Sequence, residues 1–315
     1  MNEIDCTNCL FEQPWWLDIV APGEWMVAQI NESGRIIARL PYVNKGKLKE
    51  KKIIMPRYTQ TLGPWFDESI RKEVPGNKQF AKQKEIVDAL LAQMEPFCKF
   101  EMTLDCANDY VLPYYWNGFN LSPTFSYRID LRKGINEIFN NLSKSTRKNI
   151  RKAKDESTVS YETDIDAFCY ILDKTYEAQN RKNPDSKKFI TKIIETCGRM
   201  GHGKMFTARD KDGNLQCSSY LVYDQKVAYA LIGGSVPKFR GNGSKSLVYW
   251  EEIQYAATVS KIFDFEGSMI EGIENLMRKF GAQWVTNYHI SKSGILSDIY
   301  TVMKPRIKRW IGYKM

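Results

Sequence analysis

The order of hydrophobic runs and turns in this chain occurs twice, with the copies about 180 residues apart. Each copy has three apolar runs separated by short turns that contain Gly, Asn or Asp, then a loop, a helical stretch and one more apolar run. Runs joined by such tight turns predict antiparallel strands. Each copy therefore predicts one α/β unit, and the pair predicts a duplicated domain rather than a short-period repeat. The expected strands of the two copies are 24–30, 35–40, 48–55 and 97–103, then 204–209, 215–223, 227–232 and 261–265, and the expected helices are 78–94 and 245–260.

This duplication predicts the fold class and the domains. We expect an α/β (α+β) protein of two tandem domains, each with a mixed, mostly antiparallel sheet flanked by helices. The length of 315 residues and the 43% apolar content suffice for two cores. No segment rich in Pro or Ser separates the halves. We place the domains at residues 1–132 and 133–299, with the tail 300–315 as a candidate to complete the first.

A strongly basic segment, Leu142–Lys154, opens the second half. At 100° per residue it places five cations on one side of a helix and four small or apolar residues on the other. A cationic face of this density favours an anion, most plausibly phosphate. The alternative is an ordinary solvated basic surface. The cations are Lys144, Arg147, Lys148, Arg151 and Lys154, and the opposite side holds Leu142, Thr146, Ile150 and Ala153.

A glycine-rich loop leads into the second expected helix of that half. Glycines allow successive backbone N–H groups to face one point, and a helix N-terminus adds the positive end of its dipole. The loop therefore predicts a phosphate or pyrophosphate site, although two glycines in a strand-to-helix loop are a weak signal alone. The candidate residues are Gly233, Gly234, Lys238, Gly241, Gly243 and Lys245.

A third segment, Phe263–Ser268, ends an expected strand with two carboxylates. Asp264 and Glu266 flank Phe265, so in a strand they point the same way while Phe265 points into the core. An amphipathic helix, 269–280, is expected next.

Charge and cysteine content limit the partners and the compartment. The net charge of +9 favours anionic partners such as nucleotides, nucleic acid or an acidic membrane surface. Seven scattered cysteines fit reduced thiols in a cytoplasm. Cys6 and Cys9 lack two further ligands at suitable spacing, so we expect no metal site. We find neither a signal-like N-terminus nor an apolar run of ~18 residues, so we expect a cytoplasmic protein.

Three motifs together resemble the Fem-type transferases, a branch of the GNAT acyltransferase superfamily. They are the Leu-Ser-x-x-x-Arg-x-Asn-Ile-Arg-x-Ala helix, the Lys-x-x-Gly-x-Gly loop and Phe-Asp-Phe-Glu-Gly-Ser. The N-terminal Phe11-x-x-Pro-x-Trp-Leu17 is similar to the start of such proteins. The resemblance implies tandem GNAT-like domains and transfer of an amino acid from aminoacyl-tRNA to the peptide stem of a cell-wall precursor. The chain lacks the long helical arm of the larger members, as the smaller members do.

The resemblance implies an enzyme that forms an amide bond, an acyl- or aminoacyltransferase on an amine of a cell-wall (peptidoglycan) or cell-surface precursor. One alternative is an acyl-CoA-dependent GNAT N-acyltransferase on a small-molecule, lipid or sugar amine. A second is a non-catalytic RNA-binding protein of the GNAT fold, favoured by the basic, Trp-bearing run Lys304–Trp310. No tightly bound cofactor is expected, and acyl-CoA or aminoacyl-tRNA is the donor substrate. The expected acceptor carries phosphate, as a nucleotide-sugar or lipid-linked precursor; tRNA and an anionic membrane are further candidate partners.

Amide formation assigns candidate roles. A free amine has a pKa near ~10, so it must lose a proton before it attacks. Asp264 or Glu266 is the candidate base, although Asp264 could instead cap the turn before the next helix. Tyr288 is the candidate acid that protonates the leaving group, and its alternative role is that of a half-buried strand tyrosine. Backbone N–H groups near Gly233 and Gly234 are candidates to bind the acyl carbonyl.

The remaining candidates bind substrate. Lys144, Arg147 and Arg151 are expected to contact phosphate of the acceptor or donor. Tyr176 and Arg181 are expected on a helix that faces the same cleft, where Arg181 could hold a phosphate or carboxylate.

Overall fold

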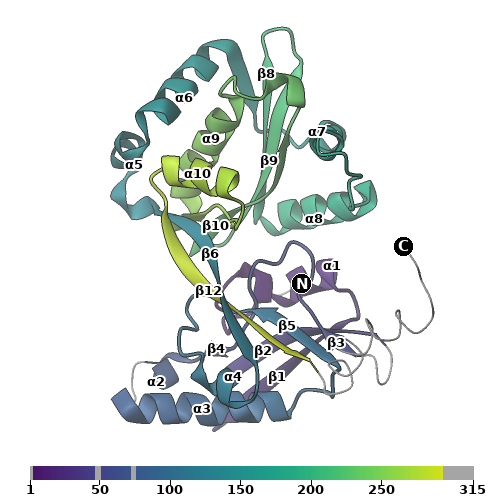
Figure 1. Cartoon of the computed structure of the whole chain (residues 1–315), viewed down its shortest axis with the longest axis vertical. Coiled ribbons are helices and arrows are strands. Elements are labelled where there is room, and N and C mark those ends of the chain that lie inside the picture. Colours follow the sequence, from purple (N-terminus) through teal and green to yellow (C-terminus); the bar gives the residue numbers. More distant parts are fainter. Residues whose placement is uncertain (1–2, 47–50, 72–75, 294–315) are drawn as a thin grey trace, which may run out of the picture. The chain divides into compact units, whose positions relative to one another are not determined.

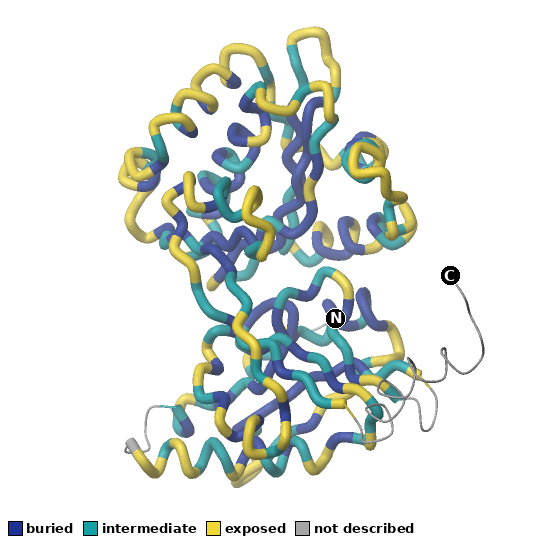
Figure 2. Tube along the Cα trace, viewed as in Figure 1, coloured by how far each residue is buried: buried dark blue, intermediate teal, exposed yellow. Residues whose placement is uncertain are grey.

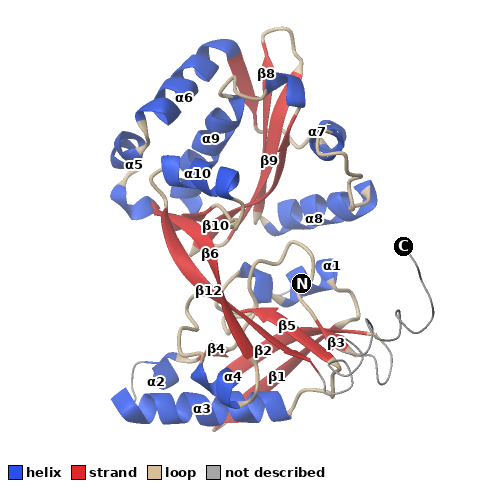
Figure 3. Ribbon diagram, viewed as in Figure 1, coloured by secondary structure: helices blue, strands red, loops and turns tan. Residues whose placement is uncertain are grey.

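The computed structural model describes residues 3–46, 51–71 and 76–293, which form two compact units (Figure 1). The first unit contains the described residues up to Thr124 and those from Thr286 onward, and the second is Phe125–Val285. Figure 3 shows that the strands are flanked by helices, and most neighbouring strands pair antiparallel. The expected fold class is confirmed. None of the helices in the described part of the chain has the length and apolar character of a membrane span.

The first unit is built around strands in the order β1-β2-β3-β5-β12, with β4 also paired to β2. Strand β3 runs parallel to β5, and β12 runs antiparallel to β5. The core of the first unit contains Phe11, Trp15 and Trp16, which are fully buried. The Trp16 ring meets the rings of Phe11 and Trp15 edge to face. The elements are η1 (Leu10–Glu12), α1 (Pro14–Val20), β1 (Trp25–Glu32), β2 (Arg35–Lys45), β3 (Lys52–Ile53), β4 (Trp65–Phe66), α2 (Glu68–Arg71), α3 (Gly76–Ala92), β5 (Lys99–Thr103), α4 (Leu112–Trp116) and β12 (Gln283–Ser293).

The second unit has strands in the order β6-β11-β10-β9-β8-β7. Helix α9 packs on β8, β9 and β10, while α7 packs on β9 and β10, and α6 lies beside α9. The elements are β6 (Asn120–Asp130), η3 (Leu131–Lys133), α5 (Ile135–Asn141), α6 (Lys144–Glu156), β7 (Ser157–Ser160), α7 (Ile165–Glu177), α8 (Lys187–Met200), β8 (Gly203–Asp210), β9 (Leu215–Tyr223), β10 (Val227–Ser235), η4 (Pro237–Phe239), α9 (Ser244–Val259), β11 (Ile262–Asp264) and α10 (Glu271–Lys279).

The same order of elements occurs in both units, as the duplication predicts. In each unit an antiparallel meander leads to a helix and then to a strand parallel to the last meander strand, β5 on β3 and β11 on β10. The strand that follows each copy pairs in the other unit: β6 pairs with β11, and β12 pairs with β5. Residues 125–132 thus belong to the second unit, and residues 286–293 belong to the first. The second unit therefore begins at 125 rather than 133 and ends at 285 rather than 299. The tail 300–315 lies outside the described residues.

The amphipathic pattern of α6 is confirmed by its burial. Leu142, Thr146, Ile150 and Ala153 are all buried, whereas Arg147 is half-buried and the other four cations are exposed. Figure 2 shows the same alternation, with buried positions recurring along a largely exposed helix. The helix begins where the Ser143 hydroxyl accepts a hydrogen bond from the Thr146 N–H, 3.1 Å away. The buried side joins a core of the second unit that is built around Phe206, Leu221, Trp250, Ile253 and Phe263.

Candidate functional site

The second unit contains two parallel strands that separate. Strands β10 and β11 pair over three residues only, and Tyr229 opposite Asp264 is the last pair. Strand β10 continues for six residues beyond it, to Ser235. On β10 the pairing with β9 skips Leu231, which is a bulge. The backbone of β10 beyond Tyr229 therefore has an edge that β11 does not cover, and a ligand could pair with it.

Two glycines occupy this uncovered part of β10. Gly233 is exposed, and a Cβ there would lie 3.0 Å from the Ser218 carbonyl oxygen. At Gly234 a Cβ would lie 2.4 Å from Thr175 Oγ1, so helix α7 packs directly on the strand. The Thr175 hydroxyl accepts a hydrogen bond from the Ser235 N–H at 2.9 Å, which fixes the end of β10. The glycines thus serve close packing here.

The loop between β10 and α9 contains two glycines in the left-handed region of backbone conformation. Gly241 and Gly243 have φ values of +85° and +95°, a region that glycine adopts readily. Gly243 also has no room for a side chain, because a Cβ would lie 2.6 Å from the Asn149 carbonyl oxygen of α6. The Asn242 side chain accepts a hydrogen bond from the Ser244 N–H at 2.9 Å. All the predicted donor-binding residues therefore lie on one continuous stretch that ends at the N-terminus of α9.

Two lysines of this stretch lie over aromatic rings. Lys238 Nζ is 5.4 Å from the centre of the Phe239 ring, and Lys245 Nζ is 5.5 Å from that of Tyr249. Both lysines are exposed. A phosphate at this helix N-terminus would meet cations from the loop and from the first turn of the helix.

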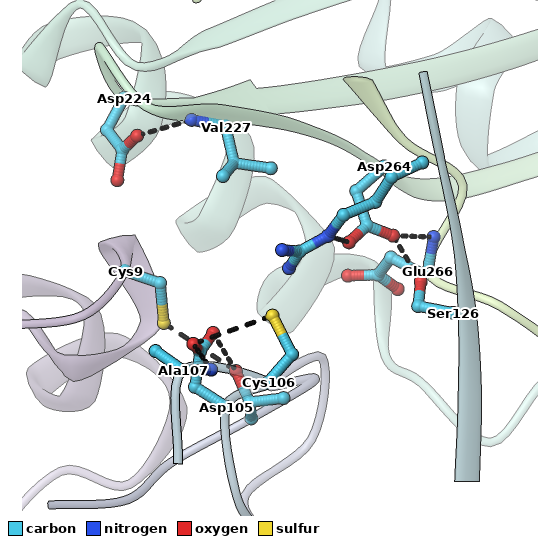
Figure 4. A network of polar contacts seen from close by, with 11 residues as sticks. Cys9, Asp105, Cys106, Ala107, Ser126, Asp224, Val227, Asp264 and Glu266 are labelled. Carbon is cyan, nitrogen blue, oxygen red and sulfur yellow. Dashed lines mark hydrogen bonds and ion pairs between the residues drawn. The ribbon is translucent and has the colours of Figure 1, made fainter. Parts of the chain in front are cut away.

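Asp264 is fully buried, and hydrogen bonds hold its carboxylate in place (Figure 4). Arg128 Nε donates to Oδ2 at 2.7 Å, and the Glu266 N–H donates to Oδ1 at 2.7 Å. The Ser126 hydroxyl also donates to Oδ1. The side chain therefore closes the turn after β11, the alternative role foreseen for it, and it holds β6 against β11. A catalytic role for this carboxylate stays a prediction.

Glu266 is in a different environment. Strand β11 ends at Asp264, and both Glu266 and Gly267 have positive φ, +62° and +66°. Glu266 Oε1 is buried without a hydrogen-bond partner in the described part of the chain. Burial, helped by the nearby negative charge of Asp264, raises the pKa of Glu266 well above its ordinary value. Glu266 thus lies two residues beyond the last residue pair of β10 and β11, in the turn that follows β11.

Gly267 fixes that turn. A Cβ at this position would lie 2.0 Å from the Phe125 carbonyl oxygen, so only glycine fits against β6. A non-glycine residue with φ near +60°, such as Glu266, stores backbone strain that is found preferentially at functional sites.

The cations of α6 have partners of their own. Arg147 Nη1 donates to the carbonyl oxygens of Asn140 and Leu142, the latter at 2.7 Å, and so caps the end of α5. Arg151 lies 5.7 Å from the centre of the Phe139 ring. Lys144 is exposed. Two of the three predicted phosphate ligands thus also hold α5 against α6, and their contact with substrate stays a prediction.

Of the remaining candidates, Tyr176 lies on helix α7 as expected, and Tyr288 is the half-buried strand tyrosine foreseen as its alternative. Arg181 is not on a helix, because α7 ends at Glu177 and Asn180 turns the chain with φ of +55°. Its guanidinium lies 5.8 Å from the centre of the Tyr176 ring, so these two do form a pair. Tyr288 is half-buried in the part of β12 that belongs to the first unit, and its carbonyl oxygen accepts from the Leu104 N–H at 2.8 Å.

Sequence reasoning missed Arg128 and Ser126. Both lie on β6, and Arg128 is 136 positions from Asp264. An arginine in a strand of unrecognised position carries no signal that it will form a buried ion pair. Only the pairing of β6 with β11 brings the two residues together.

The second unit combines an uncovered strand edge, a glycine loop at a helix N-terminus and a mixed sheet, an arrangement like that of the GNAT fold. Residues 140–267 match the family described as "Acetyltransferase (GNAT) domain". The protein is therefore a transferase. No curated protein matches the sequence.

Three solved structures show how far this likeness extends. "Crystal structure of FemX" has a TM-score of 0.70 at 14% identity, with 93% of this chain and 94% of that chain covered. The C-terminal domain (DUF2156) of a putative lysylphosphatidylglycerol synthetase from Agrobacterium fabrum has a TM-score of 0.52 at 14% identity, covering 91% and 89%. A tandem GNAT protein from the clavulanic acid biosynthesis pathway has a TM-score of 0.51 at 9% identity, covering 87% and 84%. At identities this low, the TM-scores show a shared fold alone.

Proposed function

We propose that the protein transfers an acyl or aminoacyl group to an amine of a cell-envelope precursor, as a Fem-like enzyme. The observation that carries this proposal is the separation of β10 from β11 next to the glycine loop. Such a separation offers backbone N–H groups to an extended donor, and the loop offers a phosphate site at its end. The resemblance of the FemX and lysylphosphatidylglycerol synthetase folds supports an envelope role.

The donor is an acyl-CoA or an aminoacyl-tRNA. An acyl-CoA carries a pyrophosphate, which suits the loop from Lys238 to Gly243, and an amide-bearing arm, which suits the uncovered edge of β10. An aminoacyl-tRNA carries many phosphates, which suits the exposed cations of α6 together with the net charge of +9. Both donors present an activated acyl carbon to the same stretch of β10.

Glu266 is the base in this proposal. Its carboxylate would accept a proton from the acceptor's ammonium, and the free amine would attack the acyl carbon. Backbone N–H groups beside the Leu231 bulge would stabilise the oxyanion of the tetrahedral intermediate. Collapse of that intermediate breaks the bond to the sulfur of CoA or to the ribose oxygen of tRNA, and the leaving atom takes up the proton that the attacking nitrogen loses as the amide forms. A raised pKa suits this role, because a base transfers protons best when its pKa lies near the working pH.

The test is a comparison of donors. Purified protein is melted with acetyl-CoA, CoA, aminoacyl-tRNA or deacylated tRNA, and transfer of radiolabel to lipid-linked and nucleotide-linked amines is then measured. We expect one donor class to raise the melting temperature and to support transfer. Gly243→Ala should remove that stabilisation, and Glu271→Gln, a change of an exposed carboxylate on α10, should not. Absence of both stabilisation and transfer with every donor would reject the proposal.

A further inference from the structure

The first unit contains a cavity of 230 Å³ that lies among α2, α3, α4 and the loop after β5 (Figure 1). Helix α3 contacts both α2 and α4, so the three helices support one another around it. The transfer reaction proposed above uses residues of the second unit and leaves this cavity without a role. The volume is below that of pockets for drug-sized ligands, so a molecule with a single small ring would fill it.

The polar lining of the cavity presents both donors and acceptors of hydrogen bonds. Arg71 supplies a cation and Asp109 a carboxylate, while Gln79 and Gln83 supply two amides, each of which can donate and accept. Arg71 and Asp109 attract each other, but no ion pair joins them in the part of the chain that the structure describes. With one charge of each sign, the lining favours a ligand that is neutral and that both donates and accepts.

Two of these polar groups are available to a ligand, and the other two shape the wall. Asp109 is exposed, and neither its carboxylate nor the Gln83 amide forms a side-chain hydrogen bond or ion pair with any described residue. The Arg71 guanidinium donates to the Ala107 carbonyl oxygen at 2.8 Å. The Gln79 amide donates to the Arg71 carbonyl oxygen and keeps its own oxygen as an acceptor. Asp109 and Gln83 are therefore the contacts that a ligand would gain.

The cavity continues at Tyr110 into a row of aromatic rings. Tyr110 is part of the lining, and its ring centre lies 4.6 Å from that of Phe80 and 6.5 Å from that of Trp116. Phe80 and Trp116 are about half exposed, at 47% and 54%. Exposed aromatic faces next to a polar cavity suit a ligand that has flat, weakly polar faces and polar edges.

A sugar ring has both of these properties. Each of its hydroxyl groups donates and accepts, so neighbouring hydroxyls can bind a carboxylate and an amide together. Its C–H faces are flat and pack on aromatic rings. An amino-acid zwitterion also matches the opposite charges of Arg71 and Asp109, but it would leave the Gln83 amide and the exposed rings unused.

We propose that the cavity and the aromatic row bind a neutral saccharide, with one sugar ring in the cavity and the next ring on the row. Neighbouring hydroxyls of the first ring would donate to Asp109 and exchange hydrogen bonds with Gln83. The second ring would pack against Phe80 and Trp116. The proposal concerns the first unit alone and does not depend on which donor or acceptor the second unit uses.

The experiment measures binding of matched probes to the full-length protein by saturation-transfer NMR and calorimetry. Glucose and N-acetylglucosamine are single rings, their linear trimers add rings for the aromatic row, and sorbitol carries hydroxyls without a ring. Glycine and phenylalanine test the zwitterion. We expect a trimer to bind about tenfold more tightly than its single ring, the scale of one added aromatic contact, and to raise the melting temperature. Sorbitol and both amino acids should bind more weakly than the single rings.

Variants assign the binding to this place. Asp109→Asn should weaken the preferred sugar roughly tenfold, because the hydroxyls lose a charged acceptor, and its exposed position should leave stability unchanged. Trp116→Ala should remove the advantage of the trimer and leave the affinity of the single ring unchanged. Two matched controls should keep full affinity: Glu85→Gln, an exposed carboxylate of α3, and Tyr170→Ala, an exposed aromatic residue of α7.

Four results would each overturn the proposal. They are absence of binding by every sugar, equal affinity of trimer and single ring, tighter binding of an amino acid than of any sugar, and full affinity in Asp109→Asn. Tighter binding of an amino acid would assign the cavity to a zwitterion instead.

Discussion

Asp264 and Glu266 lie two residues apart and have opposite electrostatic environments. The carboxylate of Asp264 forms an ion pair with Arg128 and also accepts hydrogen bonds from the Ser126 hydroxyl and the Glu266 N–H. Glu266 Oε1 has no partner in the described residues, and its neutral form is favoured. A buried carboxyl with a raised pKa beside an ion-paired carboxylate is typical of a site that separates a proton-transferring from a structural role.

The first prediction concerns Asp264. Asp264→Asn leaves the half-buried Arg128 guanidinium without its counter-charge, so we expect a loss of about 3–5 kcal/mol of unfolding free energy. Chemical denaturation of the purified variant measures this loss. The matched change Asp130→Asn removes an exposed ion pair with Arg132 and should cost less than about 1 kcal/mol. Equal stability of the two variants would contradict the structural role.

The second prediction concerns Glu266 and uses the donor found by the transfer assay. Glu266→Gln should lower turnover ~10²-fold or more, the scale of losing a general base, with stability nearly unchanged. In the unaltered protein the base must be ionised, and its pKa is raised above that of an ordinary glutamate. The rate should therefore increase as the pH rises through that raised pKa, and the variant should lose this increase. A pH profile identical in both proteins would exclude Glu266 as the base.

At the scale of elements, the burial of α6 follows the sequence and the role of its cations does not. The buried positions repeat every three or four residues, so periodicity alone located them. Periodicity cannot show that Arg147 reaches back to the last carbonyls of α5, because that contact depends on the turn at Leu142. The sequence therefore predicts only an exposed basic face. The structure shows that one cation of this face, Arg147, also links α6 to α5.

The third prediction separates these two roles. Arg147→Gln should lower the melting temperature by several degrees, since two carbonyl oxygens at the end of α5 lose a charged donor. Lys148→Gln, one residue along on an exposed position, should leave the melting temperature within about a degree. Thermal melting of both variants decides. If Arg147→Gln melts like the unaltered protein, the cation is available for substrate alone.

The fourth prediction concerns the loop before α9. Gly241 and Gly243 share a positive φ, but only Gly243 is crowded, 2.6 Å from the Asn149 carbonyl oxygen, while the space beside Gly241 is open. Gly241→Ala should cost about 1–2 kcal/mol from backbone strain. Gly243→Ala should cost more and should also move α6 away from α9. Chemical denaturation of both variants, followed by donor titration, measures which substitution costs more stability. A larger loss in Gly241→Ala would show that backbone strain, rather than the contact with Asn149, determines the stability of the loop.

The strands that the sequence predicted and the strands that it missed differ in how far along the chain their pairing partners lie. The meander strands, such as β8 and β9, are joined by tight turns, so each one's partner is its neighbour in sequence. Strands β6 and β12 pair with β11 and β5 across long stretches of chain. Register over such a separation depends on packing rather than on local pattern. The same limit concealed the Arg128–Asp264 pair, although Asp264 itself was found.

At the scale of the whole molecule, two buried glutamates make stability depend on pH. Burial raises the pKa of Glu12 in the first unit and of Glu252 in the second to about 8. For each glutamate the pKa in the folded state exceeds the pKa in the unfolded state. Its contribution to the free energy of unfolding is therefore complete below pH 4.5 and is lost as the pH rises to about 8. The loss is roughly 1.4 kcal/mol per pH unit for each group.

The fifth prediction follows from this sign. The melting temperature should fall between pH 5 and pH 8, and Glu252→Gln, which cannot ionise, should make that fall smaller. Glu271→Gln, at an exposed position on α10, should leave it unchanged. Melting curves at several pH values in buffers of matched ionic strength measure the slope. A slope in Glu252→Gln as steep as that of the unaltered protein would show that Glu252 ionises freely in the folded state.

The exchange of strands between the two copies ties the first unit to the end of the chain. Strand β12 pairs with β5 through five consecutive residue pairs, His289 with Thr103 to Ser293 with Lys99, and Ile290 is fully buried. A chain that ends at Val285 keeps every residue of the second unit and loses the strand that covers β5. It should melt in two steps, with the first unit unfolding at the lower temperature because one edge of its sheet and part of its core are exposed. A chain that ends at Ser293 keeps β12 and is the matched control. Calorimetry, with hydrogen exchange followed in each unit, measures the difference. If the chain ending at Val285 melts like that control, β12 adds no stability to the first unit. The duplication would then consist of two copies that are each complete without this strand.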